Sequence, residues 1–286
     1  MSSAQIINGK KIAQEIKDKI VKEVISFSRK PGLAVVLVGD DPASQVYVNS
    51  KEKACIEVGF YSQKIVLPAD TSQEELKKQI QQLNLDERID GILVQMPLPS
   101  HLNEKEVILA IDPNKDVDCF HPLNLGELIL QKKALPMSEQ LAACTPKGII
   151  RLIHSTGINL EGKKAVVVGR SHLVGKPVAL LLLAENATVK ICHSKTVDLA
   201  TECKSADVLV AAVGVPNLIK KEMIKPGVVV IDVGINRVDG KLVGDVNFEE
   251  VQQVAGYITP VPGGVGPMTI ASLLENTLIL ARRRLS

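Results

Sequence analysis

Unbroken apolar runs alternate with amphipathic stretches along the chain, and this alternation predicts strands separated by helices. The first runs lie at 33–38 and 91–95, and a partly apolar strand is expected between them at 63–67. Before the first run, apolar side chains recur with helical spacing at Ile12, Ile16, Ile20 and Val24. Strands that are apolar along their whole length are typical of parallel sheets with both faces covered. We therefore expect an α/β fold with helices on both faces of a parallel sheet.

Capping signals mark where the helices between these strands begin and end. Asp40, Asp41 and Pro42 predict a helix start, because an acidic N-cap and a proline in the first turn both favour one. Gly59 predicts the end of that helix. The sequence from Thr71 to Glu74 predicts the start of a second helix.

A second series of strands follows a turn-rich segment at 112–146. These strands are expected at 164–168, 188–192, 207–213 and 228–232. A helical apolar pattern from Ile270 to Leu280 precedes three arginines, which suit a helix C-terminus. We therefore expect two α/β domains with a cleft between them, the second of Rossmann type. The first is expected to span 1–144, completed by a helix at 268–286, and the second to span 145–267.

The composition narrows the class of protein. The 286 residues are 45% hydrophobic, which is enough for two domain cores. A net charge of +2 and only 2% aromatic residues argue against nucleic acid or an anionic membrane as a partner. With no signal-peptide pattern and no membrane-spanning apolar run, we expect a cytoplasmic protein. The five cysteines and five histidines lack metal-ligand spacing, so we expect neither a disulfide framework nor a metal site.

The most informative segment is the strand-to-helix turn from Gly169 to Gly175. An apolar strand ends at Gly169, an apolar helix follows at 178–184, and a second strand is expected at 188–192. A βαβ unit with glycines in its first turn favours a phosphate group at the helix start. Five residues separate Gly169 and Gly175, so the spacing departs from G-x-G-x-x-G. We expect a dinucleotide site here, with an ordinary tight turn as the alternative.

The residues after the second strand indicate which dinucleotide binds. A site for NAD usually has an acidic residue there, which holds the ribose 2′-hydroxyl. This chain instead has His193, Ser194 and Lys195, and Arg170 lies in the glycine turn. The two cations and the Ser194 hydroxyl suit a 2′-phosphate, so we expect NADP. A solvated basic cluster is the alternative.

A second candidate is the pair Tyr47 and Lys51, four residues apart on the helix that begins at Pro42. Residues at this spacing share a helix face, and a lysine beside a tyrosine hydroxyl can transfer protons. Short-chain dehydrogenases have the same Y-x-x-x-K spacing, but their glycine loop precedes the pair, whereas here it follows. The order of the motifs argues against that family. An exposed surface pair is the alternative.

Three other segments carry candidate ligand contacts. Gln95 follows an apolar strand, and parallel sheets place ligands at such strand ends. One carboxylate of Asp116 and Asp118 could accept two N–H groups from an amino-pyrimidine ring, although turn capping is an alternative. The loop at 260–269 combines three glycines with three prolines, so a ligand can approach its main chain closely.

With these residues considered together, the chain resembles the bifunctional methylenetetrahydrofolate dehydrogenase/methenyltetrahydrofolate cyclohydrolase family over its whole length. Eight motifs carry the resemblance, in the same order as in the family. They are the segments 47–53, 94–99, 115–118, 144–148, 168–177, 192–196, 232–236 and 262–269.

The resemblance implies an enzyme of one-carbon metabolism that carries out two reactions on tetrahydrofolate derivatives. A hydride would pass from 5,10-methylenetetrahydrofolate to NADP⁺, and water would then open the methenyl product to 10-formyltetrahydrofolate, which links the enzyme to purine biosynthesis. It also implies a homodimer. A monofunctional NAD-dependent dehydrogenase, a non-catalytic nucleotide-binding protein and a hydroxy-acid or amino-acid dehydrogenase are the alternatives.

The resemblance also implies roles for individual residues. Lys51 matches the family's catalytic lysine, Tyr47 its orienting tyrosine, Gln95 the amide that positions the lysine, and Asp118 the carboxylate that grips the pterin. Further substrate contacts are implied at Pro97, Leu98, Pro262, Gly263 and Gly264. Cofactor contacts are implied at Gly169, Arg170, Ser171, Gly175, Pro177, His193, Ser194, Gly214, Gly234 and Ile235.

Two positions depart from the family pattern. Cys119 stands where the family commonly has glycine after Asp118, and Ala143 stands where it commonly has proline. If residue 119 has a positive φ, a side chain there could crowd the pterin site. We therefore expect any change in folate selectivity to arise at Cys119.

Overall fold

The computed structural model describes residues 3–285, and its alternating strands and helices confirm the α/β class. The chain divides into two compact units. The three-stranded unit holds residues 15–127 and 270–285, and the six-stranded unit holds residues 3–14 and 128–269. Residues 1, 2 and 286 of the expected domains lie outside the described part.

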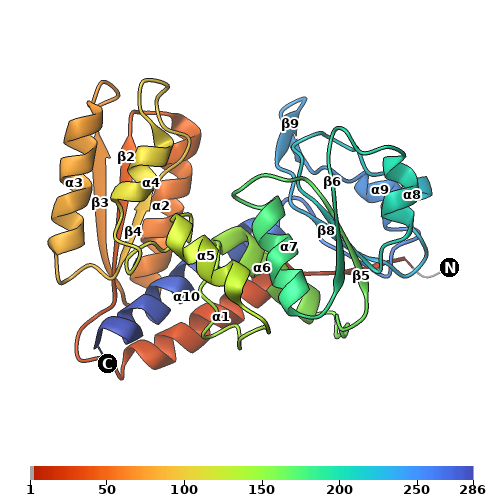
Figure 1. Cartoon of the computed structure of the whole chain (residues 1–286), viewed down its shortest axis with the longest axis horizontal. Coiled ribbons are helices and arrows are strands. Elements are labelled where there is room, and N and C mark those ends of the chain that lie inside the picture. Colours follow the sequence, from red (N-terminus) through yellow and green to blue (C-terminus); the bar gives the residue numbers. More distant parts are fainter. Residues whose placement is uncertain (1–2, 286) are drawn as a thin grey trace. The chain divides into compact units, whose positions relative to one another are not determined.

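The three-stranded unit is a parallel sheet in the order β3-β2-β4, with helices on both faces (Figure 1). Its strands are β2 (Gly32–Val38), β3 (Tyr61–Leu67) and β4 (Gly91–Val94). Its helices are α2 (Pro42–Glu57), α3 (Gln73–Leu85) and α4 (Glu104–Ala110), with most of α1 (Gly9–Val24) and α10 (Val265–Leu285). The expected helix starts are confirmed, since Asp41 caps α2 and Ser72 forms a capping box with Glu75.

The core of this unit follows from the period of two along β2. Ala34, Val36 and Val38 point to one face of the sheet, where they pack in one apolar cluster with residues of α3 and α4. The cluster includes Leu76, Ile80, Leu83 and Val107. The other residues of β2 are also buried, so the strand is covered on both faces, as its unbroken apolar run predicts.

The six-stranded unit is a parallel sheet in the order β1-β11-β8-β7-β5-β6. The strands are β1 (Gln5–Ile6), β5 (Lys164–Val168), β6 (Thr188–Cys192), β7 (Val208–Ala211), β8 (Val229–Asp232) and β11 (Tyr257–Ile258). The remaining elements are α6 (Cys144–His154), α7 (Gly175–Ala184), α8 (Leu199–Lys204), α9 (Phe248–Val251), a 3₁₀ turn at Lys221–Met223, and the hairpin β9 (Asn236–Val238) with β10 (Lys241–Val243). Helix α5 (Pro122–Leu130) runs from one unit into the other.

The unit boundaries differ from the expected domain limits at 3–14, 128–144 and 268–269. Residues 3–14 belong to the six-stranded unit, because β1 pairs with β11 at the edge of that sheet. Residues 128–144 belong to it as well, and there the amide of Ala134 donates a hydrogen bond to the carbonyl oxygen of Ala184 at 3.0 Å.

Other differences concern element ends. Strand β7 ends at Ala211, two residues early, because the amide of Val213 donates instead to the carboxylate of Asp245. Helix α10 begins at Val265, directly after the last glycine of the Gly–Gly pair. The two-residue strands β1 and β11 carry too little pattern to be read from the sequence.

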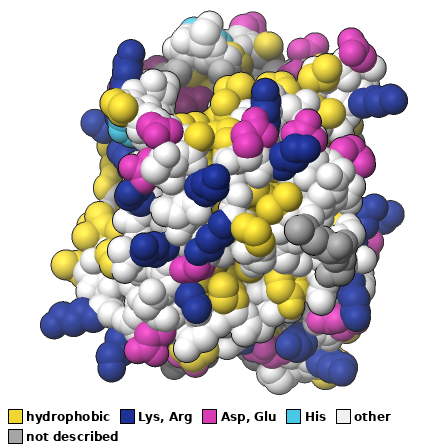
Figure 2. Space-filling model, turned by 90° about the vertical axis from the view of Figure 1, so that its right-hand side faces the viewer, with side chains coloured by type: hydrophobic (Ala, Val, Ile, Leu, Met, Phe, Trp, Pro, Cys, Tyr) yellow, Lys and Arg dark blue, Asp and Glu magenta, His cyan; other side chains and the backbone are white. Residues whose placement is uncertain are grey.

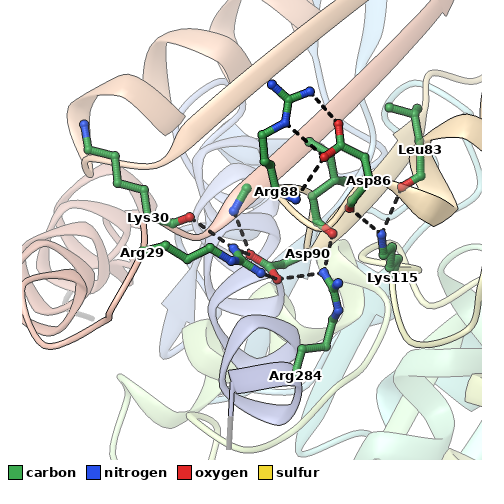
Figure 3. A network of polar contacts seen from close by, with 10 residues as sticks. Arg29, Lys30, Leu83, Asp86, Arg88, Asp90, Lys115 and Arg284 are labelled. Atoms are coloured by element: carbon green, nitrogen blue, oxygen red, sulfur yellow. Dashed lines mark hydrogen bonds and ion pairs between the residues drawn. The ribbon is translucent and has the colours of Figure 1, made fainter.

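A network of buried charges connects α10 to the three-stranded sheet (Figure 3). The carboxylate of Asp90 is fully buried. It accepts hydrogen bonds from Nη1 and Nη2 of Arg29, each at 2.7 Å, and from Nη1 of Arg284 at 2.9 Å. It also accepts one from the amide of Gly32 at 2.9 Å. Two cations and a backbone amide therefore surround one buried anion, which compensates for its lost hydration.

Lys115 lies beside this network (Figure 3). Its ammonium donates to the carbonyl oxygens of Leu83 at 3.0 Å and Asp86 at 2.8 Å, at the C-terminal end of α3. Burial lowers the pKa of Lys115 to about 8, and the nearby charge of Arg284 acts in the same direction.

The surface carries mixed charge. Figure 2 shows basic and acidic side chains interspersed over one face of the molecule rather than gathered by sign. Among residues 3–285, no helix combines the length and the apolar character needed to cross a bilayer. The same part of the chain contains no cluster of three or more histidine, cysteine or acidic side chains placed to hold a metal ion. All five cysteines are buried thiols.

The buried network predicts a large stability loss on removal of its central charge. Asp90→Asn leaves Arg29 and Arg284 without their anion, so we expect the free energy of unfolding to fall by about 3 kcal/mol. Glu106→Gln, which breaks the exposed pair with Lys77, is the control and should cost under about 1 kcal/mol. Denaturant titration measures both losses, and equal small losses would contradict this account.

Lys115 predicts a pH dependence of stability. Since the pKa of Lys115 is about 8 in the folded protein and that of an ordinary lysine is 10.5, the unfolded chain binds more protons between these two pH values. The contribution of Lys115 to the free energy of unfolding should therefore rise as the pH increases from 8 to 10.5. This contribution is measured as the free energy of unfolding of the unmodified protein minus that of Lys115→Met at each pH. A flat or falling difference would contradict the lowered pKa.

Candidate functional site

The three-stranded unit brings together two of the expected catalytic residues. Lys51, on α2, donates a hydrogen bond from Nζ to Oε1 of Gln95 at 2.9 Å, directly after β4. Tyr47 lies one turn earlier on the same helix, and its side chain is 45% exposed. Helix α2 and the end of β4 therefore present a half-buried ammonium beside an exposed phenol.

The orientation of the Gln95 amide is fixed by a second contact. Its Nε2 donates to the carbonyl oxygen of Met96 at 2.6 Å, so Oε1 faces Lys51. The Met96–Pro97 bond that follows is cis, and the segment continues with an exposed Pro97 and a half-buried Leu98. Pro97 and Leu98 therefore follow within three residues of Gln95, whose side-chain amide holds Lys51.

The loop from Asp116 to His121 holds Asp118, the fourth expected catalytic residue. Asp116 is buried, and its carboxylate accepts from the amide of His121 at 2.8 Å and from Nδ2 of Asn124 at 2.9 Å. Burial raises the pKa of Asp116, which these donors oppose. Asp118, two residues later, is half-buried. Of the two aspartates, Asp116 is therefore the one that caps the turn.

Cys119 has a positive φ of 55°, the left-handed region that favours glycine. A positive φ at residue 119 is the condition under which we expected its side chain to affect folate selectivity. The thiol is 2% exposed, and Sγ donates toward the carbonyl oxygen of Asp116 at 3.8 Å. Its side chain is therefore directed into the protein interior.

In the six-stranded unit, the turn after β5 requires its two glycines. Gly169 has a φ of 131°, and a Cβ built on it would lie 2.2 Å from the carbonyl oxygen of Ala212. A Cβ on Gly175 would lie 2.3 Å from the carbonyl oxygen of Gly169. The backbone of the turn thus packs against itself and against the end of β7, as a close-fitting nucleotide turn requires.

The amides at the start of α7 already have partners within the turn. The Ser171 hydroxyl accepts from the amides of Val174 at 3.1 Å and Gly175 at 3.3 Å, and its carbonyl accepts from Lys176 at 3.0 Å. Pro177, buried in the first turn, has no N–H to offer. The expected phosphate site therefore differs from a simple helix N-terminus. The first amides of α7 already donate to Ser171, and Pro177 has no N–H.

The segment after β6 forms a tight turn that displays polar side chains. The amide of His193 donates to Thr196 Oγ1 at 2.8 Å, and His193 Nδ1 accepts from the amide of Lys195 at 3.1 Å. Ser194 and Lys195 are exposed, and so is Arg170 after the neighbouring strand β5. Because β5 and β6 are parallel neighbours, these side chains follow strand ends at the same edge of the sheet.

Two buried carboxylates that the sequence reasoning missed brace the neighbouring strand ends. Asp245 accepts from the amides of Val213 at 2.7 Å and Gly214 at 3.0 Å, and from Asn236 Nδ2 at 3.0 Å. Asp232 accepts from the amides of Gly234 at 3.0 Å and Asp245 at 2.9 Å, and burial raises its pKa to about 6. The sequence signal for Asp232 is an acidic residue at the end of an apolar strand, with a glycine two residues later.

These carboxylates explain two of the expected cofactor positions. A Cβ on Gly234 would lie 2.2 Å from Oδ1 of Asp245, so only glycine fits there. Gly214 has a φ of 70° and donates to the same carboxylate. Ile235, next to Gly234, is 52% exposed, and an exposed apolar side chain at a strand end is available for a ligand.

The Pro/Gly loop is held by its own backbone. The amide of Gly264 donates to the carbonyl oxygen of Pro260 at 2.9 Å, and Gly263 has a φ of 108°. A Cβ on Gly9, in the first turn of α1, would lie 1.9 Å from the carbonyl oxygen of Gly264. The loop therefore has the stiff main chain that its prolines and glycines predict.

The expected residues thus form two groups, each within one unit. The lysine–glutamine pair and the aspartate loop lie in the three-stranded unit, and the glycine turn, the polar turn after β6 and the Pro/Gly loop lie in the six-stranded unit. The first group can orient an amino-substituted ring and manage a proton. The second has the features of a dinucleotide site.

Two family models match the chain, one in its N-terminal half and one in its C-terminal half. The model of the tetrahydrofolate dehydrogenase/cyclohydrolase catalytic domain matches residues 7–118. The model of the NAD(P)-binding domain of the same family matches residues 143–285.

Individual proteins are similar over almost their whole length. The bifunctional protein FolD of Moorella thermoacetica is 60% identical over 284 residues, which cover 98% of this chain and 99% of that protein. The structure of the bifunctional enzyme FolD from Campylobacter jejuni has 47% identity and a TM-score of 0.94, covering 99% of this chain and 100% of that one. The Trypanosoma brucei FolD structure, complexed with NADP cofactor and inhibitor, has 39% identity and a TM-score of 0.93, covering 99% of each chain. This chain therefore belongs to the tetrahydrofolate dehydrogenase/cyclohydrolase family.

Proposed function

We propose that this protein oxidises 5,10-methylenetetrahydrofolate with NADP⁺ and hydrolyses the methenyl product to 10-formyltetrahydrofolate. The hydrogen bond of 2.9 Å between Lys51 and Gln95 is the observation that carries the proposal, in a chain that matches both family domains. It gives the oriented ammonium that the hydrolytic step requires.

The six-stranded unit would hold the cofactor, which accepts a hydride when bound. The glycine turn fits a dinucleotide, because a Cβ on Gly169 would strike the backbone of Ala212. Exposed Arg170, Ser194 and Lys195 would bind the 2′-phosphate. The remaining cofactor contacts are proposed at Ser171, Gly175, Pro177, His193, Gly214, Gly234 and Ile235.

The substrate would be held mainly by the three-stranded unit. Asp118 would accept two N–H groups from the amino-pyrimidine edge of the pterin, and Tyr47 would orient its ring system. We assign further substrate contacts to Pro97, Leu98, Pro262, Gly263 and Gly264. Oriented binding lowers the barrier to hydride transfer, since positioning is the main requirement of that step.

Hydrolysis requires proton movement near Lys51. Water adds to the methenyl carbon and the bond from that carbon to N5 breaks. Both protons must leave the water oxygen, so that one reaches N5 and the other is released to solvent. The Lys51 ammonium, kept in place by Gln95, is the group on this helix that can hold and pass a proton there. Tyr47 lies one turn away on the same helix.

The proposal also covers the compartment, the oligomeric state and the metabolic role of the protein. We infer a cytoplasmic homodimer that supplies formyl groups for purine biosynthesis. We also propose that residues 1–144 with 268–286 act as the folate domain and residues 145–267 as the NADP domain. The match of the catalytic-domain model to residues 7–118 and of the NAD(P)-binding-domain model to residues 143–285 supports the two domain roles.

Removing the ammonium should abolish the hydrolytic step. We expect Lys51→Met to lower the rate of methenyltetrahydrofolate hydrolysis by about 100-fold or more, because general acid–base groups contribute on that scale. Lys53→Met, two residues along the same helix, is the control and should retain activity. Loss of the methenyl absorbance measures the rate. Hydrolysis at the unmodified rate in Lys51→Met would overturn the role of this lysine.

Removing the guanidinium from the glycine turn should weaken the preference for NADP⁺. For Arg170→Ala we expect the ratio of kcat/KM for NADP⁺ to that for NAD⁺ to fall by about tenfold, because a charge-assisted hydrogen bond to the 2′-phosphate is lost. Lys163→Ala, at the opposite end of β5, is the control. An unchanged ratio in Arg170→Ala would remove this residue from the 2′-phosphate site.

A further inference from the structure

Asn276 is a fully buried polar residue on α10 whose side chain reaches the aspartate loop. Its Nδ2 donates to the carbonyl oxygen of Val117 at 2.8 Å and lies 3.9 Å from Sγ of Cys119. These are the residues directly before and directly after Asp118. One amide group therefore contacts both sequence neighbours of the proposed pterin-binding carboxylate.

The same loop is held from within by Asp116. Its carboxylate accepts from His121 and Asn124, and its carbonyl oxygen accepts from the amide of Cys119 at 3.4 Å. The turn is thus closed by Asp116 and joined by Asn276 to α10. The segment that carries Asp118 is anchored on both sides of that residue.

We propose that Asn276 is a positioning residue for Asp118, which it serves by fixing the backbone on either side of that carboxylate. The inference rests on the proposed function, because it takes Asp118 to bind the pterin. An apolar side chain could fill the same space in α10, but it could not donate to Val117, whose buried carbonyl would lose this partner. Geometry set by such a contact controls the direction of a bidentate hydrogen bond.

The test measures the affinity of the full-length protein for 5,10-methylenetetrahydrofolate without NADP⁺, so that no oxidation occurs. The variants are Asn276→Leu, which removes the donor at similar size, Asp118→Ala, and the double variant. Thr277→Val is the matched control, because Thr277 is also buried on α10 but donates within its own helix, to the carbonyl of Leu273 at 2.9 Å. Thermal unfolding and the Kd for NADP⁺ are measured for every variant.

We expect Asn276→Leu to weaken folate binding by about tenfold, and Thr277→Val to change it by less than about twofold. In the Asp118→Ala background, Asn276→Leu should have almost no further effect, because a positioning residue acts only through the group that it positions. The Kd for NADP⁺ should not change. If Asn276→Leu does not yield folded protein, Asn276→Ser, whose hydroxyl is too short to replace the amide, serves in its place.

Two outcomes would overturn the inference. One leaves the assignment of Asp118 as the pterin contact intact, and the other removes it. If Asp118→Ala weakens folate binding but Asn276→Leu adds its full effect in that background, Asn276 has only a structural role and the proposed function stands. If Asp118→Ala leaves folate affinity unchanged, the assignment of Asp118 as the pterin contact fails, and the role of Asn276 fails with it.

Discussion

Buried parallel strands impose the constraint on which the candidate site depends. Once helices cover both faces of a sheet, the polar groups that the strands can offer to a ligand lie where the strands end. Gln95 follows β4, the glycine turn follows β5, and Ser194 follows β6. The same arrangement recurs in both units, so one packing rule places both Gln95, which accepts from the ammonium of Lys51, and the cations after β5 and β6.

Strand ends also leave backbone amides that need partners, and buried carboxylates supply them. Asp116, Asp232 and Asp245 each accept from at least two N–H groups in loops that carry proposed ligand contacts. Burial of the first two raises their pKa values, so the folded loops hold these charges at an electrostatic cost that the amides offset. The result is stiff loops, which lose little conformational freedom when a ligand binds.

The sequence was most informative where a local pattern determines the structure. The unbroken run at 33–38 and the cap at Asp41 correctly located β2 and α2, because apolar period and capping are local signals. The Lys51–Gln95 contact could be expected only through family resemblance, since it joins residues 44 positions apart. Asn276 gave no sequence signal at all, because its partners lie about 160 positions away. Side-chain contacts across the fold therefore had to come from the structure.

The pairing of β1 with β11 has a consequence for synthesis of the chain. The strand at Gln5–Ile6 is synthesised about 250 residues before its partner at Tyr257–Ile258. The three-stranded unit likewise waits for Arg284 before Asp90 gains its second cation. Neither unit can be completed until these later segments have been made. A nascent chain that stops before Tyr257 exposes β8 as an open sheet edge, the kind of edge at which chains aggregate.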